Sequence, residues 1–422
     1  MDGSIPRRRF LQSAGAATTA AAVALGPRRG NAAEQIAEDA QPPAVTPMLA
    51  QPKDSAQPKG EAFDPAKFVV MHQLVQAGHA KMKPIAWNYL LGCADTETTM
   101  RRNRHALDSV AFKPRALRGV GKVDTRGKFL GKTMRLPVLM SGIGSVGLID
   151  PGGAATVAKA ASTFGVAMGY SSVAKPGLEE TAAAGNCPKI VQLYVRGDDA
   201  WIDAYAERAI KAGYDAFAFI IDSAHFSRRE RDIIHAGNNA NLSDEPDPYL
   251  STLDWDKIKR FKDRHKNVAV GLKGITTGED AELGLKAGVS VIWVSTHGGR
   301  QVDHARGAYE ILPEIVQAAK GKATIVFDSG VYRGTDVVKA LATGADIVGI
   351  GRLYAYGLAN GEAGVVRVLE ILEKEIEACM ANLGAKNVAA LNKSLITAST
   401  SMNPPGLFSA FPLMDTTGLS SV

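Results

Sequence analysis

Eight short apolar segments alternate with amphipathic stretches of helical period over residues 137–350, and this alternation limits the fold more than any other feature. Continuous apolar segments are typical of strands covered on both faces, which are parallel. Alternating strands and helices indicate α/β architecture, and eight such units in about 250 residues match a (β/α)8 TIM barrel. A doubly wound sheet is the alternative, although no G-x-G-x-x-G follows the first segment, which disfavours a dinucleotide-binding version. The predicted strands are Pro137–Met140, Val166–Tyr170, Ile190–Tyr194, Ala216–Ile221, Val268–Leu272, Val289–Val294, Thr324–Phe327 and Ile347–Ile350.

The segments around these strands complete one predicted domain, residues 62–392. Residues 62–134 include a helical stretch near Phe68–Met82, so we expect an N-terminal helical cap packed on the barrel. The interval after the fourth strand is unusually long and contains Asn238 and Pro246, which predicts a long loop over the barrel mouth. Residues 393–422 are expected to form a C-terminal tail.

The N-terminal 61 residues differ in composition from the rest of the chain. Arg7-Arg8-Arg9-Phe10-Leu11 fits the twin-arginine export pattern, and the apolar stretch Ala14–Leu25 is too short to span a bilayer. Residues 1–32 are therefore predicted to be a cleavable twin-arginine signal that directs the protein to the periplasm; a disordered basic tail is the alternative. The twin-arginine route carries folded proteins, which hints at a cofactor bound before export. Residues 33–61 hold five prolines and read as an extended Pro/Ala-rich linker.

Charge and cysteine content exclude several classes of protein. The net charge is +6, of which residues 1–32 contribute +4, so the folded part carries only +2 and shows no basic stripe of a nucleic-acid binder. The three cysteines are far apart and form no C-x-x-C, so we predict neither a zinc site nor a disulfide framework, and no metal. We also predict no transmembrane span. The sequence leaves both a monomer and a homo-oligomer open.

Polar residues follow the predicted strands at the end where TIM barrels build their active sites. Glycine-rich turns after the seventh and eighth strands, Asp328-Ser329-Gly330 and Gly349-Ile350-Gly351-Arg352, indicate a phosphate site. His297, between Ser295 and Arg300, is the histidine best placed for catalysis.

Four further charged residues near these strand ends could have either a role in binding or catalysis or an ordinary structural role. Lys273 ends an apolar strand and needs a partner such as an anion or a polar ring. Asp222 could orient His297 or cap its own loop. Arg229 and Arg300 could bind an anion or form ordinary surface ion pairs.

Several of these motifs, taken together, resemble a known family. Ser295-Thr296-His297-Gly298-Gly299-Arg300-Gln301-Val302-Asp303 is similar to the signature of the FMN-dependent α-hydroxy acid oxidases and dehydrogenases. The resemblance covers about residues 80–385, in the same order along the chain. The further matching motifs are Gln192-Leu193-Tyr194, Arg228–Asp232, Lys273-Gly274, Asp328–Asp336 and Gly351-Arg352.

The resemblance implies an FMN at the barrel mouth and oxidation of a small-molecule 2-hydroxy acid to the 2-keto acid. His297 would be the base, paired with Asp222, and Tyr194 would contact the substrate hydroxyl. Arg229 and Arg300 would bind the substrate carboxylate. Electrons would pass through the flavin to an acceptor such as oxygen, a quinone or a cytochrome. The implied FMN-binding residues are Gly142, Ile143, Gly144, Ser171, Gln192, Lys273, Ser295, Asp328, Ser329, Gly330, Arg333, Gly351 and Arg352.

The sequence departs from the family pattern around the substrate and part of the flavin. Asn88, taken as a substrate contact, stands where we place a family tyrosine, and Gly142-Ile143-Gly144 replaces Pro-Thr-Ala. Ile220 replaces a threonine, and Tyr332 replaces an arginine. These changes leave two alternatives open: the same flavin chemistry on an amino- or amide-type C–H next to a carbonyl, and a non-catalytic FMN-binding protein.

Overall fold

The computed structural model describes residues 63–236 and 248–414. The predicted signal and linker, and the part of the predicted loop around Asn238 and Pro246, lie outside the described residues. Within the described ranges, no helix is both long and apolar enough to cross a membrane.

Eight parallel strands close into a barrel in the order β10-β11-β4-β5-β6-β7-β8-β9, which confirms the predicted TIM barrel. Almost every residue of these strands is buried, because helices cover the outer face and side chains fill the inner one. The predicted segments differ from the observed strands by at most three residues at either end. The strands are β4 (Val138–Met140), β5 (Ala167–Ser171), β6 (Lys189–Leu193), β7 (Ala216–Ile220), β8 (Ala269–Ile275), β9 (Val291–Val294), β10 (Thr324–Phe327) and β11 (Ile347–Ile350).

A hairpin fills the barrel near the amino-terminal ends of its strands. Strands β2 (Gly127–Phe129) and β3 (Lys132–Met134) bring Phe129 and Met134 into an apolar cluster with Ala167 and Ala216, the first residues of β5 and β7. This end of the barrel is therefore closed by apolar side chains. The opposite, carboxyl end is left for polar groups.

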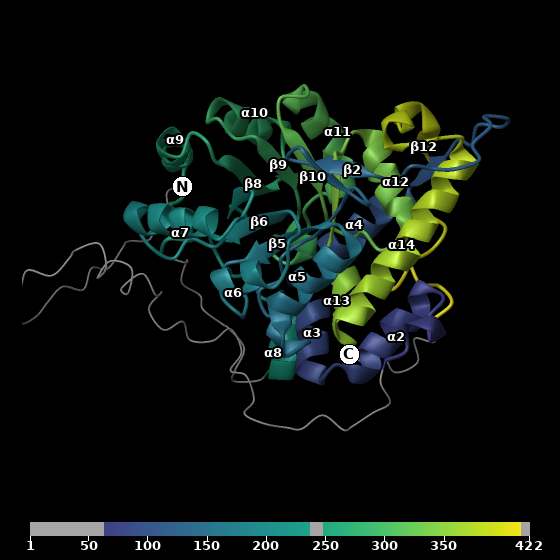
Figure 1. Cartoon of the computed structure of the whole chain (residues 1–422), viewed down its shortest axis with the longest axis horizontal. Helices are drawn as coiled ribbons and strands as arrows, with labels where there is room; N and C mark the ends of the chain where they lie inside the picture. Colours follow the sequence, from purple (N-terminus) through teal and green to yellow (C-terminus); the bar gives the residue numbers. More distant parts are fainter. Residues whose placement is uncertain (1–62, 237–247, 415–422) are drawn as a thin grey trace, which may run out of the picture. The chain divides into compact units, whose positions relative to one another are not determined.

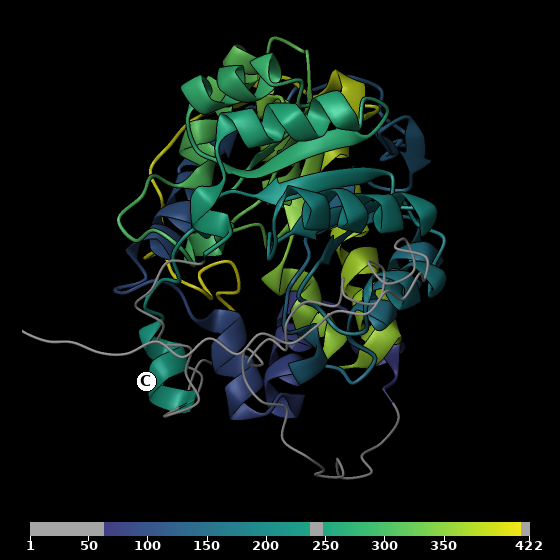
Figure 2. The same ribbon diagram turned by 90° about the vertical axis from the view of Figure 1, so that its left-hand side faces the viewer.

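Helices surround the strands and supply the outer layer of the core (Figures 1 and 2). Several begin at a side-chain cap: Asp198, Asp254 and Thr277 each accept a hydrogen bond from a backbone N–H of the first turn. The long helix α14 (Gly361–Leu383) packs against α13, α12 and α5. The other outer helices are α5 (Gly153–Phe164), α6 (Leu178–Ala183), α7 (Asp199–Lys211), α9 (Trp255–Arg264), α10 (Gly278–Lys286), α11 (Ala308–Ala319), α12 (Gly334–Thr343) and α13 (Arg352–Leu358).

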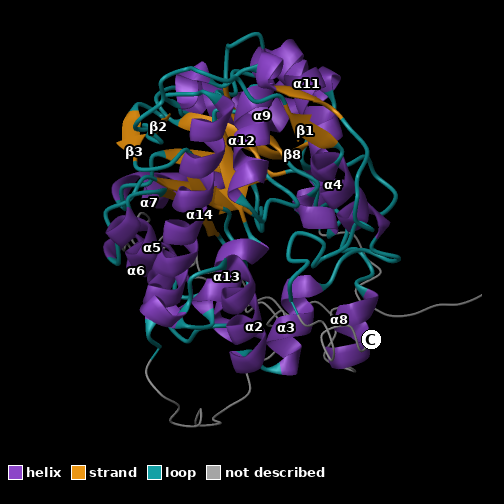
Figure 3. Cartoon of the chain, turned by 90° about the vertical axis from the view of Figure 1, so that its right-hand side faces the viewer, coloured by secondary structure: helices purple, strands orange, loops and turns teal. Residues whose placement is uncertain are grey.

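The N-terminal helices form the expected cap. Figure 3 shows α2 (Met71–Lys81), α3 (Pro84–Leu91) and α8 (Glu230–Ala236) gathered beside α13, away from the strands. Helix α2 packs on α13, and α3 packs on α8, which belongs to the long interval after the fourth barrel strand. Because α8 and α13 both follow barrel strands, the cap lies at the carboxyl end of the barrel. Helix α4 (Thr98–Asp108) joins the cap to α11.

The described part of the predicted C-terminal tail packs against the cap region. Strand β12 (Ile396–Ala398) pairs antiparallel with β1 (Val110–Phe112), which follows α4. Phe411 is 1% exposed, and its ring meets those of His72 and Tyr356 edge to face. This segment therefore holds cap and barrel together.

Candidate active site

A cavity opens at the carboxyl ends of the barrel strands, where TIM barrels carry their active sites. Tyr89 and Leu90 of α3 line it from the cap. The rest of the lining comes from the carboxyl ends of the barrel strands and from the segments that follow them, so residues far apart in sequence share one space. Among those residues are Ser141, Tyr194, Arg229, Lys273, His297, Arg300, Asp328 and Arg352.

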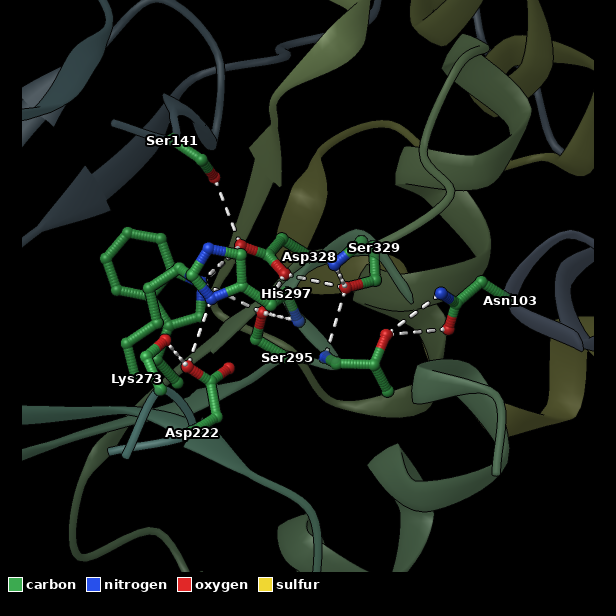
Figure 4. A network of polar contacts seen from close by, with 12 residues as sticks. Asn103, Ser141, Asp222, Lys273, Ser295, His297, Asp328 and Ser329 are labelled. Atoms are coloured by element: carbon green, nitrogen blue, oxygen red, sulfur yellow. Dashed lines mark hydrogen bonds and ion pairs between the residues drawn. The ribbon is translucent and has the colours of Figure 1, made fainter. Parts of the chain in front are cut away.

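His297 lies between a carboxylate and a phenol. Its Nδ1 is 3.0 Å from Oδ1 of Asp222, and its Nε2 is 3.2 Å from Oη of Tyr194 (Asp222 and His297 are labelled in Figure 4). Gly274 allows the carboxylate this position, because a Cβ there would lie 2.8 Å from Cβ of Asp222. With Nδ1–H donated to Asp222, Nε2 is left with its lone pair toward the cavity. The predicted pairing of His297 with Asp222 is thus present in the structure.

Burial sets the protonation of these groups. Burial lowers the pKa of His297 below its ordinary 6.5, although the Asp222 carboxylate opposes the shift. Burial also raises the pKa of the Tyr194 phenol, which keeps its proton at neutral pH. The imidazole is therefore neutral near pH 7 and able to accept a proton, and Tyr194 is able to donate a hydrogen bond.

Two arginines lie side by side beyond the histidine. Nε of Arg229 is 3.2 Å from the carbonyl oxygen of Arg300, and the guanidinium of Arg300 lies over the ring of Tyr89, 4.9 Å from its centre. Burial, reinforced by the charge of Arg300, lowers the pKa of Arg229 to about 10. Nη2 of Arg300 is buried and has no hydrogen-bond partner among the described residues. Arg300 is also 3.8 Å from the Asp232 carboxylate, so these two half-buried cations have one anion nearby and favour a second bound anion, such as a carboxylate.

Two buried polar groups lack partners at the neighbouring strand ends. Nε2 of Gln192, a residue 1% exposed, and Oγ of Ser171, 2% exposed, make no hydrogen bond within the part of the chain that the structure describes. Leaving each unsatisfied costs about 1–3 kcal/mol, so a ligand with complementary groups is expected here. Gly142 makes the space, because a Cβ at that position would lie 2.4 Å from Nε2 of Gln192.

Asp328 is the centre of a buried polar network (Figure 4). Its carboxylate accepts hydrogen bonds from Oγ of Ser141, at 3.2 Å, and from Nε1 of Trp293, at 2.9 Å. The hydroxyls of Ser295 and Ser329 also donate to it. Nζ of Lys273 donates to Ser295 and lies 3.9 Å from the Asp328 carboxylate, so this buried cation is matched by a buried anion.

The sequence profile of the FMN-dependent dehydrogenases matches residues 78–398. The chain belongs to this family. Its cofactor is therefore FMN, and the protein is an FMN-dependent oxidoreductase of the 2-hydroxy acid oxidase and dehydrogenase group. The unpartnered Gln192 and Ser171 and the buried Lys273 are the kinds of groups that such a cofactor requires.

Curated relatives and solved structures agree with the assignment. The chain is 33% identical to an L-lactate oxidase of Nostoc sp. over 350 residues, covering 76% of this chain and 96% of the relative. It is 32% identical to the glycolate oxidase of Spinacia oleracea, covering 75% and 92%. The recombinant flavin-binding domain of baker's yeast flavocytochrome b2 superposes with a TM-score of 0.75 at 30% identity, covering 81% of this chain and 89% of the other. A mandelate oxidase with (S)-2-phenylpropionate superposes with a TM-score of 0.72 at 32% identity, covering 79% and 99%.

Two predicted site residues, Asn88 and Arg333, neither line the cavity nor bond through their side chains to a residue that lines it. The side chain of Asn88 donates to the carbonyl oxygen of Pro84 inside α3, whereas the adjacent Tyr89 faces the cavity and its Oη accepts from the backbone N–H of Ser145. Arg333 forms an ion pair with Glu375, on the outer side of the barrel. The sequence gives the right segments here, but not which of two neighbouring residues faces inward.

The remaining predicted cofactor residues lie at the barrel mouth. Gly142, Ile143, Gly144, Gly330 and Gly351 line the cavity together with Asp328 and Ser329. Arg352 also lines it, but its guanidinium donates to backbone carbonyl groups, including those of Leu90 and Gly298. Arg352 therefore connects α3 of the cap to the barrel. It also lies after β11, where the sequence predicts the phosphate site.

Ser141, Tyr89 and Trp293 belong to this site but were not predicted from the sequence. Tyr89 stacks under Arg300, and Trp293 reaches Asp328 from inside the barrel. A tryptophan in a strand looks like ordinary core, and only its Nε1–H, which needs an acceptor when buried, signals a polar role.

Proposed function

We propose that the protein oxidises a 2-hydroxy acid to the corresponding 2-keto acid. The observation that supports this best is the convergence on one cavity of a neutral base and an anion site. His297 is held by Asp222, and Arg229 and Arg300 are adjacent to it. A protein that only stored flavin would need neither group, so the pairing favours an enzyme over a binding protein.

The side chains suggest their roles in the reaction. The substrate carboxylate binds at Arg229 and Arg300, which orients the hydroxyl toward Tyr194 and His297. The substrate loses two electrons and two protons, and Nε2 of His297 is the atom placed to take a proton. FMN, when bound, would supply the acceptor for the two electrons and the second hydrogen, and an external oxidant would then take up the electrons. Burial of the site keeps water from competing with substrate for these donors.

The test is anaerobic flavin bleaching. Purified holoenzyme is mixed with 2-hydroxy acids of increasing side-chain size, and with 2-amino acids and amides of the same side chains as the competing class. We expect bleaching by members of the first set. Bleaching only by the amino or amide set, or by none, would overturn the proposed function. Adding oxygen, a quinone or cytochrome c to the reduced enzyme then identifies the acceptor by the rate of flavin reoxidation.

We also propose that the protein is exported through the twin-arginine route. The proposal rests on the sequence of residues 1–32, where paired arginines precede an apolar stretch. Arg7→Lys combined with Arg8→Lys is expected to retain the protein in the cytoplasm, measured by fractionation and immunoblotting. Periplasmic yield equal to that of the unmodified chain would contradict the export proposal and leave the enzymatic proposal untouched.

A further inference from the structure

One cation of the cavity is unlike the others, namely Arg196. It follows β6 and lines the same cavity as Tyr194, whereas Val195 between them is 1% exposed and belongs to the apolar core. Nε of Arg196 is buried and without a partner, and its guanidinium makes no hydrogen bond or ion pair with any described residue. A guanidinium offers five N–H donors, so this one is the least satisfied cation at the site.

The charges around the cavity leave Arg196 without an evident counterion. Five cationic side chains line it, and Asp328 is the one carboxylate among its described lining residues. Lys273 faces Asp328, and Arg352 is engaged by backbone carbonyl groups. Arg300 lies 3.8 Å from the Asp232 carboxylate, and a substrate carboxylate would supply a second anion for the pair Arg229 and Arg300. Of these five cations, Arg196 is the one with neither a carboxylate nor an oxygen acceptor among the described residues, and a half-buried cation favours an anion beside it.

Strand order separates Arg196 from the phosphate end of the cofactor site. The predicted phosphate loops follow β10 and β11, and two strands, β4 and β5, stand between β11 and β6 in the barrel. Strand β6 is instead adjacent to β7, after which Asp222 and Arg229 lie. Arg196 is thus on the substrate side. Apolar groups, Val173 and Phe226, line the same cavity and could flank a short aliphatic spacer.

We infer that Arg196 forms a second anion subsite, and that the substrate is a 2-hydroxy acid bearing another carboxylate at its far end. The inference rests on the proposed function and narrows its substrate class. One carboxylate binds at Arg229 and Arg300 next to the reacting carbon, and the other reaches Arg196 across a few methylene groups. The same bond changes occur as for any 2-hydroxy acid, because the second carboxylate takes no part in them.

Equilibrium binding to the holoenzyme tests the subsite without relying on turnover. Keto acids do not reduce the flavin, so 2-oxoglutarate and 2-oxopentanoate form a pair that differs in the distal carboxylate. We expect calorimetry to show the dianion binding at least tenfold more tightly than the monoanion, the size of one charge-assisted hydrogen bond. Arg196→Met should abolish that preference and leave monoanion binding within twofold. Arg196→Lys should retain part of it.

The controls separate the possible failures. Arg208→Met removes an arginine on α7 that pairs with Glu179 outside the cavity, and it should leave the preference unchanged. A preference that survives Arg196→Met, or no preference in the unmodified enzyme, would overturn the subsite. A loss of FMN affinity in Arg196→Met would also overturn it, because the arginine would then serve the cofactor.

Flavin bleaching by 2-hydroxyglutarate and 2-hydroxypentanoate distinguishes this inference from the proposed function. Bleaching by both at equal efficiency refutes the dicarboxylate class and keeps the 2-hydroxy acid oxidation. Bleaching by neither, with dianion binding that depends on Arg196, refutes the oxidation and keeps the anion subsite. If neither keto acid binds and neither hydroxy acid bleaches the flavin, both proposals fail.

Discussion

The two sides of the cavity differ in how closely they follow the family pattern. On the side after β7, β8 and β9, His297, Asp222, Lys273 and the arginine pair stand where the family motifs place them. On the side after β4 and β6, Gly142-Ile143-Gly144 departs from that pattern, and Arg196 lines the same side. In the proposed reaction the first group moves protons and charge, and the second surrounds the substrate and the cofactor. The contrast suggests that the chemistry is retained while the range of accepted molecules has changed.

Replacing the base should produce the largest effect on flavin reduction. His297→Asn keeps the size of the side chain but removes its basicity. We expect flavin reduction by the best substrate to slow by about 10²–10⁴-fold, or roughly 3–5 kcal/mol of barrier. Stopped-flow bleaching measures it, with the FMN content of each preparation determined from absorbance. Reduction within threefold of the unmodified enzyme at equal FMN content would mean that His297 is not the base.

Replacing the buried lysine should have the next largest effect. Lys273 is 4% exposed and faces Asp328, so Lys273→Met removes the cation that the family resemblance places beside the flavin. Reduction that builds negative charge there should slow by about 10²–10³-fold, the usual loss for one preorganised electrostatic contact. The flavin midpoint potential should fall as well. An unchanged potential and rate would place the lysine away from the reducible part of the cofactor.

The pH dependence of flavin reduction tests the protonation state of His297. The base must be neutral, and burial lowers the pKa of His297 below 6.5, so flavin reduction should be independent of pH above 6.5 and its acid limb should lie at lower pH. Asp222 raises the pKa of His297 and Lys273 lowers it. The acid limb should therefore move to lower pH in Asp222→Asn and to higher pH in Lys273→Met. A shift of the acid limb to higher pH in Asp222→Asn, or to lower pH in Lys273→Met, would contradict the proximity of these three groups.

The smallest effect is expected at the residue that the sequence analysis placed wrongly on the substrate side. Asn88→Ala should change kcat/KM by less than twofold, because its side chain bonds within α3. Thermal unfolding should show a loss of about 0.5–1.5 kcal/mol for the missing hydrogen bond. Tyr89→Phe is the matched variant on the cavity side. A larger catalytic loss for Asn88→Ala than for Tyr89→Phe would reverse the assignment.

The barrel could be predicted because each strand is a continuous apolar segment, and this pattern can be recognised in the sequence without knowing any contacts. The strand ends also supplied His297, Lys273 and Asp328, since the end of a strand fixes where the next side chains lie. In turns and helices it was harder to predict which residue faces the cavity. Neighbouring helical positions such as Asn88 and Tyr89 differ by about 100° in direction, and this depends on how α3 docks. Ser329 has a φ of 88°, which redirects the chain before Arg333 in a way that no local pattern reveals.

The pairing of β1 with β12 also bears on the order in which the protein can be completed. Val110 pairs with Ala398, and the whole barrel lies between them in the sequence. During synthesis the edge of β1 therefore stays open until the ribosome has made nearly all of the chain. A chain that terminates early, before Ile396, exposes an unpaired strand edge of the kind that recruits other chains. Strand β12 thus covers the edge of β1, and a chain that ends before β12 leaves that edge exposed.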